Sequence, residues 1–163
     1  AEMLSRNYDD GQAFLRERFN TIKEDYQEDN DDWSEEVVGT EDAVNRIDDF
    51  DFADGSNIYL VEVPVKEPWQ VFAYIPFGGW NECPDADEQM AVAKYWYEKY
   101  GAVAAHFSND MIQYYLPKPV TDNTMSVAEE HMGYCEDAVL QGDNLTTLAA
   151  TIKESTVWTF WWD

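Results

Sequence analysis

Residues 85–116 read DADEQMAVAKYWYEKYGAVAAHFSNDMIQYYL, a predicted helix followed by a predicted hairpin. Gly101 follows the helical stretch 85–100 at the position where helices often end in a left-handed residue. Residues 102–107 and 111–116 are predicted strands, and Ser108-Asn109-Asp110, which is typical of a tight turn, joins them. The predicted core-facing residues of the helix are Met90, Ala93, Tyr97 and Tyr100, with Trp96 beside them. A helix that leads into a hairpin is typical of an α+β protein.

The sequence on either side of this stretch predicts more elements of both kinds. The additional predicted helices are 12–23, 124–134 and 144–152. The additional predicted strands are 58–63, 69–75 and 156–162. In the last of these strands, alternation places Trp158, Phe160 and Trp162 on one face, which we expect to fill the core. The expected fold is therefore α+β, with a single mixed or antiparallel sheet packed with helices.

The acidic side chains are unevenly distributed along the chain. The 163 residues include 34 acidic and 10 basic side chains, which gives a formal net charge of −24. Residues 1–55 alone hold 18 acidic and 5 basic side chains. A turn sequence at 54–57 then separates this acidic region from the aromatic-rich remainder. We therefore expect an acidic, partly helical N-terminal extension over 1–57 and a compact α+β domain over 58–163.

The strong negative charge limits the possible partners. It repels nucleic acids and anionic membrane surfaces, so neither is an expected partner. No apolar run approaches the roughly 20 residues of a membrane helix, and the first residues lack a signal-peptide pattern, which together predict a soluble cytoplasmic protein. The acidity has three interpretations: solubility, attraction of a basic protein partner, or a high-salt habitat.

Four sequence blocks in the aromatic-rich part of the chain are distinctive. The blocks are Pro-Phe-Gly-Gly-Trp-Asn-Glu-Cys-Pro at 76–84, Gly-Tyr-Cys-Glu-Asp at 133–137, Gln-Gly at 141–142 and Phe-Trp-Trp-Asp at 160–163. In this order they resemble a bacterial domain-of-unknown-function family, family 4253, and the resemblance extends over about residues 58–163. It implies a compact α+β domain at the C-terminal end of the protein. It implies no established activity, cofactor or catalytic residue.

Cys83 is the strongest catalytic candidate in the sequence. It directly precedes Pro84, and proline favours the first turn of a helix, so we expect Cys83 at a helix N-terminus. Free amide N–H groups there would stabilise a thiolate and lower the pKa of the thiol. Asn81 would orient the substrate or the thiolate, and His131 would act as the base. The alternative is a structural cysteine, because cysteine is among the residues most often buried.

A metal site built on the two cysteines is a weaker hypothesis. His131 and Cys135 are four positions apart and so share a helix face. With Cys83 they would supply two thiolates and an imidazole, which are ligands that zinc prefers. The sequence offers no evident fourth ligand and no closely spaced cysteine pair, so we expect no metal and no cofactor. A Cys83–Cys135 disulfide is an alternative that a reducing cytosol disfavours.

The same blocks contain the candidates for binding, which are Gly78, Gly79, Trp80, Cys135 and Asp137. The two glycines would allow a ligand to approach the backbone closely, whereas the alternative is a simple turn with Trp80 in the core. Acid pairs at 129–130 and 136–137 have the side chains for acid–base chemistry. Because adjacent helix positions point in different directions, we expect these pairs to lie mostly on solvated faces.

Two functions from different classes remain. The sequence contains no P-loop, no dinucleotide-binding glycine motif and no Gly-x-Ser-x-Gly elbow, which removes the usual support for three enzyme classes. We expect a non-catalytic acidic module that binds a basic protein, with an immunity or antitoxin role against a basic toxin as one concrete form. The alternative is a thiol-dependent enzyme with Cys83 as its nucleophile.

Overall fold

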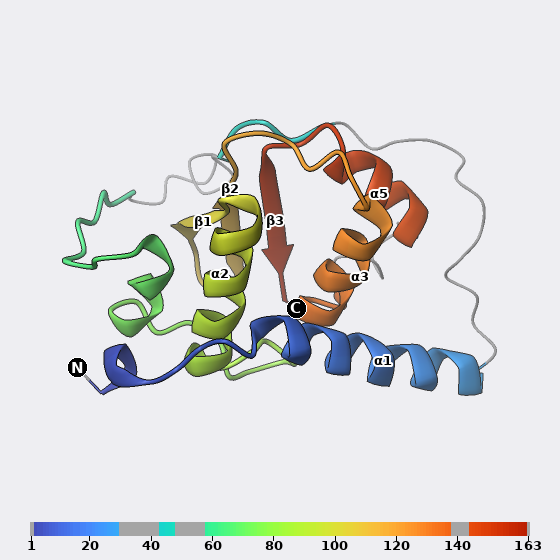
Figure 1. Cartoon of the computed structure of the whole chain (residues 1–163), viewed down its shortest axis with the longest axis horizontal. Helices are drawn as coiled ribbons and strands as arrows, with labels where there is room; N and C mark the ends of the chain where they lie inside the picture. The colour runs from blue at the N-terminus through green and yellow to red at the C-terminus, as the bar shows by residue number, and fades with distance from the viewer. Residues whose placement is uncertain (1, 30–42, 48–57, 138–143, 163) are drawn as a thin grey trace.

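The computed structural model describes residues 2–29, 43–47, 58–137 and 144–162 and has an α+β fold (Figure 1). Its α-helices are α1 (Gly11–Asp29), α2 (Ala86–Tyr100), α3 (Thr124–Tyr134) and α5 (Leu145–Ile152). Its strands are β1 (Val103–Phe107), β2 (Met111–Tyr115) and β3 (Val157–Trp161), and short 3-10 helices cover Met3–Ser5 and Pro68–Ala73. The predicted fold class is therefore confirmed.

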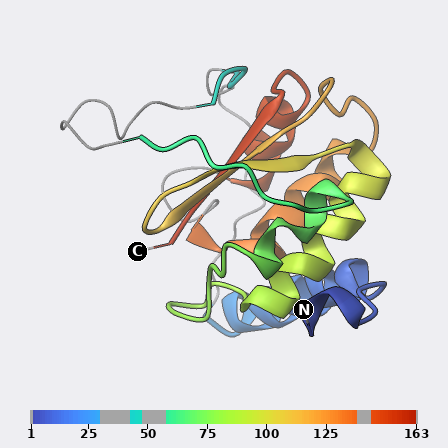
Figure 2. The same cartoon turned by 90° about the vertical axis from the view of Figure 1, so that its left-hand side faces the viewer.

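The three strands form one antiparallel sheet in the order β1-β2-β3. Tyr114 in the central strand lies opposite Ala104 on one side and Trp158 on the other. The register of β1 shifts between Ala104 and His106, which places a bulge in that edge strand. Helices α1, α2 and α3 lie on one face of the sheet (Figure 2). The core therefore forms between this face and the helices.

Helix α2 is fixed at both ends by its own sequence. The Asp85 side chain accepts hydrogen bonds from the amides of Asp87 and Glu88, and Glu88 bonds back to the Asp85 amide. This reciprocal capping box starts the helix after Asp85. Gly101 ends it with φ of 73°, a left-handed conformation that glycine adopts without a Cβ clash. The predicted helix is thus confirmed, and it begins two residues after Pro84.

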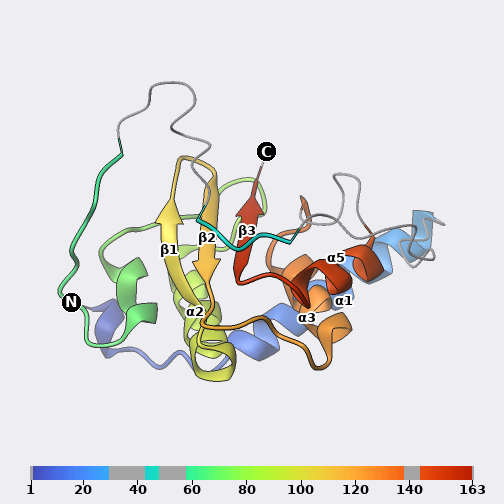
Figure 3. The ribbon, with the colours of Figure 1, turned by 90° about the horizontal axis from the view of Figure 1, so that it is seen from above.

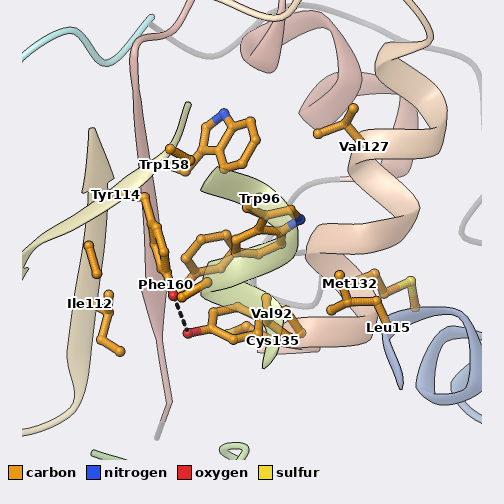
Figure 4. Packing of buried hydrophobic residues seen from close by; sticks show 14 of the residues in the cluster. Leu15, Val92, Trp96, Ile112, Tyr114, Val127, Met132, Cys135, Trp158 and Phe160 are labelled. Carbon is orange, nitrogen blue, oxygen red and sulfur yellow. Dashed lines mark hydrogen bonds between the residues drawn. The ribbon is translucent and has the colours of Figure 1, made fainter. Parts of the chain in front are cut away.

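Aromatic side chains from the helices and the sheet form the centre of the core (Figure 4). Trp96 from α2 is fully buried and stacks on Phe160 of β3, with 5.3 Å between ring centroids. Tyr114 and Trp158 meet the Trp96 ring edge-on, each at 5.3 Å. Trp162 is buried as well. The prediction that one face of the last strand fills the core is confirmed.

Helix α1 is part of the same core, although it lies in the region predicted to be an extension. Its buried residues on one side include Leu15, Phe19 and Ile22. A Cβ on Gly133 of α3 would overlap the carbonyl oxygen of Leu15, so the two helices approach each other at backbone distance. Figures 1 and 3 show α1 running along the ends of α2 and α3. Residues 11–22 therefore belong to the folded body and do not form an outward-facing addition.

Two of the predicted strands are wrong. Residues 68–73 form a 3-10 helix because Pro68 occupies its first turn and Gln70 Oε1 accepts the Glu67 amide at 3.2 Å. Residues 58–63 contain no strand and follow a drawn-out course away from the sheet (Figure 3). Their β-branched and aromatic composition favours a strand, but none of the strands β1, β2 and β3 in the described sheet pairs with these residues.

The remaining segments complete the sheet and the helical layer. Val44 accepts backbone hydrogen bonds from Thr156 and Val157, so residues 43–47 dock at the start of β3. Asn144 caps α5 by accepting the Thr147 amide at 2.8 Å. Within the described residues, no helix has both the length and the apolar character needed to cross a membrane.

Candidate functional site

The loop 76–84, the end of α3 and the end of β3 meet in space, and we call this region the motif junction. Phe77 from the loop packs against Trp162, with 5.8 Å between ring centroids. The Cys135 thiol, just after α3, donates a hydrogen bond to the carbonyl oxygen of Trp161 at 3.0 Å. Three of the four blocks that carried the resemblance are thus brought together. The fourth, 141–142, lies outside the described residues.

A strained turn forms the tip of the loop. The Cys83 amide bonds the Trp80 carbonyl at 2.7 Å, and the two residues between them, Asn81 and Glu82, have φ of 44° and 60°. Such positive angles are typical of a type I′ turn, which asparagine tolerates and glutamate disfavours. Gly78 also has a positive φ, and a Cβ there would overlap the Pro84 carbonyl oxygen. The loop therefore requires glycine at this position.

Cys83 points into the protein and lacks the features of a nucleophile. Its side chain is only 5% exposed, and it accepts a hydrogen bond from Gln89 Nε2 at 3.4 Å. Burial, together with the nearby Cys135, raises the pKa of the Cys83 thiol to about 12. The expected lowering is wrong because Asp85 already occupies the first amides of α2.

The structure does not join His131 to Cys83. His131 is buried among Trp96, Trp158 and Phe160, at ring-centroid distances of 5.6, 4.5 and 4.8 Å. Burial lowers the pKa of His131 to about 3, so the ring is neutral at physiological pH. Among the described residues no hydrogen bond links His131 to Cys83, and no group of three His, Cys, Asp or Glu side chains is arranged to hold a metal ion.

The other binding candidates have different surroundings. Trp80 is half-buried and packs edge-on against Phe77 at 4.8 Å, while Gly79 lies at the surface with open space around its Cα. Asp137 is half-buried beside Glu136 at the end of α3. Burial, and to a lesser degree the neighbouring Asp137, raises the pKa of Glu136. These residues surround the junction, whereas Cys135 is sealed inside it.

An open cleft beside the motif junction concentrates negative charge. It has a volume of about 650 Å³, and we call it the acidic cleft. Among the described residues that line it, five are carboxylic acids and Arg18 is the single cation, while Phe14 and Ile22 add apolar surface. The acids are Glu17, Asp25, Glu82, Glu88 and Glu136. Helix α1, the strained turn, the first turn of α2 and the end of α3 all contribute to it.

Arg18 connects the parts of the acidic cleft. Its guanidinium donates a hydrogen bond to the Glu82 carbonyl at 2.7 Å and lies 5.6 Å from the centre of the Phe14 ring. The arginine therefore ties α1 to the strained turn while its charge offsets one of the five carboxylates. The lining keeps a formal charge of −4 when the carboxylates are ionised. Such a site favours a cationic ligand over an anionic one.

Sequence reasoning missed the acidic cleft because four separate elements build it. The available signal was local: Phe14, Arg18 and Ile22 are four residues apart on α1 and therefore share a face. That face carries a cation between two apolar residues, which differs from a purely apolar stripe. Only the packing of α1 on the rest of the fold shows that Glu82 and Glu136 lie beside it.

Glu130 is a second polar site that the sequence did not predict. We expected a solvated acid, but Glu130 is buried and accepts hydrogen bonds from Tyr95, Trp96 and Tyr100. Lys99 completes the set, with its ammonium 3.0 Å from the carboxylate. Lys99 also borders a second cleft of about 710 Å³ at the other end of α3. Because Glu130 already pairs with this lysine, the interaction joins α2 to α3 and leaves less charge for a ligand.

Comparison with known proteins places the chain in a family without adding an activity. The family model described as Domain of unknown function (DUF4253) matches residues 59–163. No curated protein and no solved structure matches the chain. The matched range includes the loop 76–84, all of α2 and α3 and the whole sheet. With these elements in one folded body, this protein belongs to the DUF4253 family.

Proposed function

We propose that this protein is a non-catalytic binding module and that its acidic cleft holds a basic segment of a protein partner. The observation that carries the proposal is the lining of the cleft, with five carboxylates, one guanidinium and two apolar side chains. A lysine or arginine would place its methylene stem against Phe14 and Ile22 and its charged end among the carboxylates.

The conformation of Glu82 supports this proposal. A glutamate with φ of 60° costs roughly 1 kcal/mol relative to a relaxed backbone, and glycine would avoid that cost. This turn places Glu82 in the lining of the cleft, and Arg18 holds the turn through the Glu82 carbonyl. Strained residues often occur where a side chain must be presented for function.

The thiol chemistry considered above gains no comparable support. Cys83, in the loop before α2, is buried with a raised pKa, and His131 lies among aromatic rings on α3. A binding role is therefore the function that this geometry favours. One concrete form is an immunity or antitoxin protein that captures a basic toxin.

The test uses a hexalysine peptide as a defined basic probe, with its affinity measured by titration calorimetry. The cleft variant Glu17→Gln/Glu82→Gln removes two exposed carboxylates of the acidic cleft. The control variant Asp122→Asn/Glu154→Gln removes two exposed carboxylates elsewhere. Each variant neutralises two carboxylates and takes the formal net charge from −24 to −22, so the long-range attraction stays matched.

We expect the cleft variant to bind hexalysine about fivefold more weakly than the control variant, because two exposed ion pairs contribute about 0.5 kcal/mol each. The affinity of the unmodified protein for hexalysine should also fall as NaCl is raised from 50 to 500 mM. Salt screens the attraction, because the screening length shortens from about 10 Å at 0.1 M toward about 3 Å at 1 M. Equal affinities for the two variants would show that net charge alone attracts the peptide, and the proposed cleft would be wrong.

A further inference from the structure

The segment 58–63 exposes a continuous row of apolar side chains. Leu60 is fully exposed, and Tyr59 keeps 78% of its surface in contact with solvent. Ile58 and Val61 are also exposed. Single exposed apolar residues are common, but four in succession form a surface that soluble proteins usually bury or use for binding.

The backbone of this segment is also available. Among the described residues, positions 58–62 form no backbone hydrogen bond with any other element. The composition favours a strand, yet the described sheet ends at the bulged edge of β1. Figure 2 shows the segment crossing in front of the sheet without joining it, and Figure 3 shows it well to one side of β1. The sequence thus specifies a strand for which the described chain provides no partner.

We propose that residues 58–63 pair as a β-strand with an extended segment of the basic partner, which alternates basic and apolar side chains. Strand addition pairs the alternate amides and carbonyls that point to one edge, and it brings the partner's side chains beside those of the exposed row. This inference deepens the proposed function and rests on it, because the partner is taken to be basic.

Charge decides between the candidate occupants. The segment itself carries one charged side chain, Glu62. A second copy would bring a further net charge of −24 to the contact, and nucleic acids and anionic membranes would also be repelled. Alternation in a strand places Glu62 on one face and Tyr59 and Val61 on the other. A partner strand with lysine or arginine on one face and apolar residues on the other would set its cations beside Glu62 and its apolar side chains beside Tyr59 and Val61.

The experiment uses the full chain and a seven-residue peptide that alternates lysine and valine, with hexalysine as the comparison. Hydrogen–deuterium exchange is followed for the amides of 58–63 by mass spectrometry. We expect saturating alternating peptide to slow exchange at least tenfold at about half of these amides, because one added strand bonds alternate amides. Hexalysine, which lacks apolar side chains, should leave the exchange unchanged.

Variants of the segment separate backbone pairing from charge. Leu60→Pro/Val61→Pro removes two consecutive amide donors, whereas Leu60→Val/Val61→Ile keeps the donors and the strand preference. We expect the proline variant to bind the alternating peptide no more tightly than hexalysine and the control to bind it like the unmodified protein. Both variants change only exposed residues outside helices and strands, so the fold should persist.

The outcomes distinguish this inference from the proposed function. If 58–63 stays unprotected while hexalysine still binds the cleft variant more weakly than the control variant Asp122→Asn/Glu154→Gln, strand addition is wrong and the acidic cleft stands. If these two variants bind hexalysine equally, the proposed function fails whatever the segment does. Concentration-dependent dimerisation of the protein alone, with protection of 58–63, would identify a second copy as the occupant and overturn the inference.

Discussion

The motif junction and the acidic cleft are built on the same loop, but the side chains of that loop point inward at the junction and outward at the cleft. Cys83 turns inward and is buried beside Gln89, whereas Glu82, the preceding residue, turns outward into the cleft. The residues that carry the family resemblance are mainly those that fix the loop against Trp162 and the end of α3. The comparison teaches that a distinctive sequence block can identify a packing arrangement while the functional surface lies next to it.

The largest expected effect comes from Gly78→Ala in the motif junction. The added Cβ would overlap the Pro84 carbonyl oxygen at a φ of 97°, so we expect unfolding to require about 4 kcal/mol less free energy. Gly79→Ala is the matched control: its φ is 84°, but the Cβ meets nothing, and the expected cost is about 1 kcal/mol. Urea unfolding measures both. Equal losses would show that the loop is not packed as described.

The second prediction concerns His131, which the core keeps neutral. Because its folded pKa is about 3 and its ordinary value is 6.5, the stabilisation is present above pH 6.5 and is lost as the pH falls toward 3. At pH 4 this loss amounts to about 3 kcal/mol. His131→Leu should lack this part of the acid sensitivity. Parallel urea titrations at pH 7 and pH 4 measure the difference, and identical pH dependence in both proteins would contradict a buried neutral histidine.

The third prediction, with the smallest expected effect, concerns the rate at which the Cys83 thiol is alkylated near neutral pH. With its pKa raised to about 12, it should react slowly with iodoacetamide at pH 8 and speed up only as the pH approaches 12. Cys135→Ser isolates this thiol and keeps a donor for the Trp161 carbonyl. Alkylation followed by mass spectrometry, with the urea-unfolded protein as reference, gives the rates. Rapid reaction of the folded protein with a midpoint below about 8.5 would restore the nucleophile hypothesis.

The parts of the fold that follow from local sequence were predictable. Helix α2 carries its start and stop signals in adjacent residues, Asp85 and Gly101, and the hairpin of β1 and β2 follows directly. The predicted strand at 58–63 fails because a strand also needs a neighbour, which propensity cannot supply. Residues 68–73 show the opposite conflict, since Pro68 and the cap from Gln70 override a strand-like composition.

The candidate site was less predictable because its parts are distant in sequence. The expectation for Cys83 depended on whether α2 starts at Pro84 or at Ala86. The observed start, two residues later, makes Asp85 the cap of the helix in place of Cys83. The acidic cleft required the docking of α1, and the burial of Glu130 required four donors, from Tyr95, Trp96, Lys99 and Tyr100. Each of these depends on tertiary contacts that no single sequence window contains.

The backbone contact between α1 and the rest of the fold has a practical consequence for how this family is cut into fragments. A polypeptide limited to the matched range 59–163 would lack Leu15 and Phe19 and would open to water the seam that α1 occupies along Gly133. Such a fragment would be prone to aggregate even with every matched residue in place. The range that the family model matches and the extent of the hydrophobic core therefore differ in this protein.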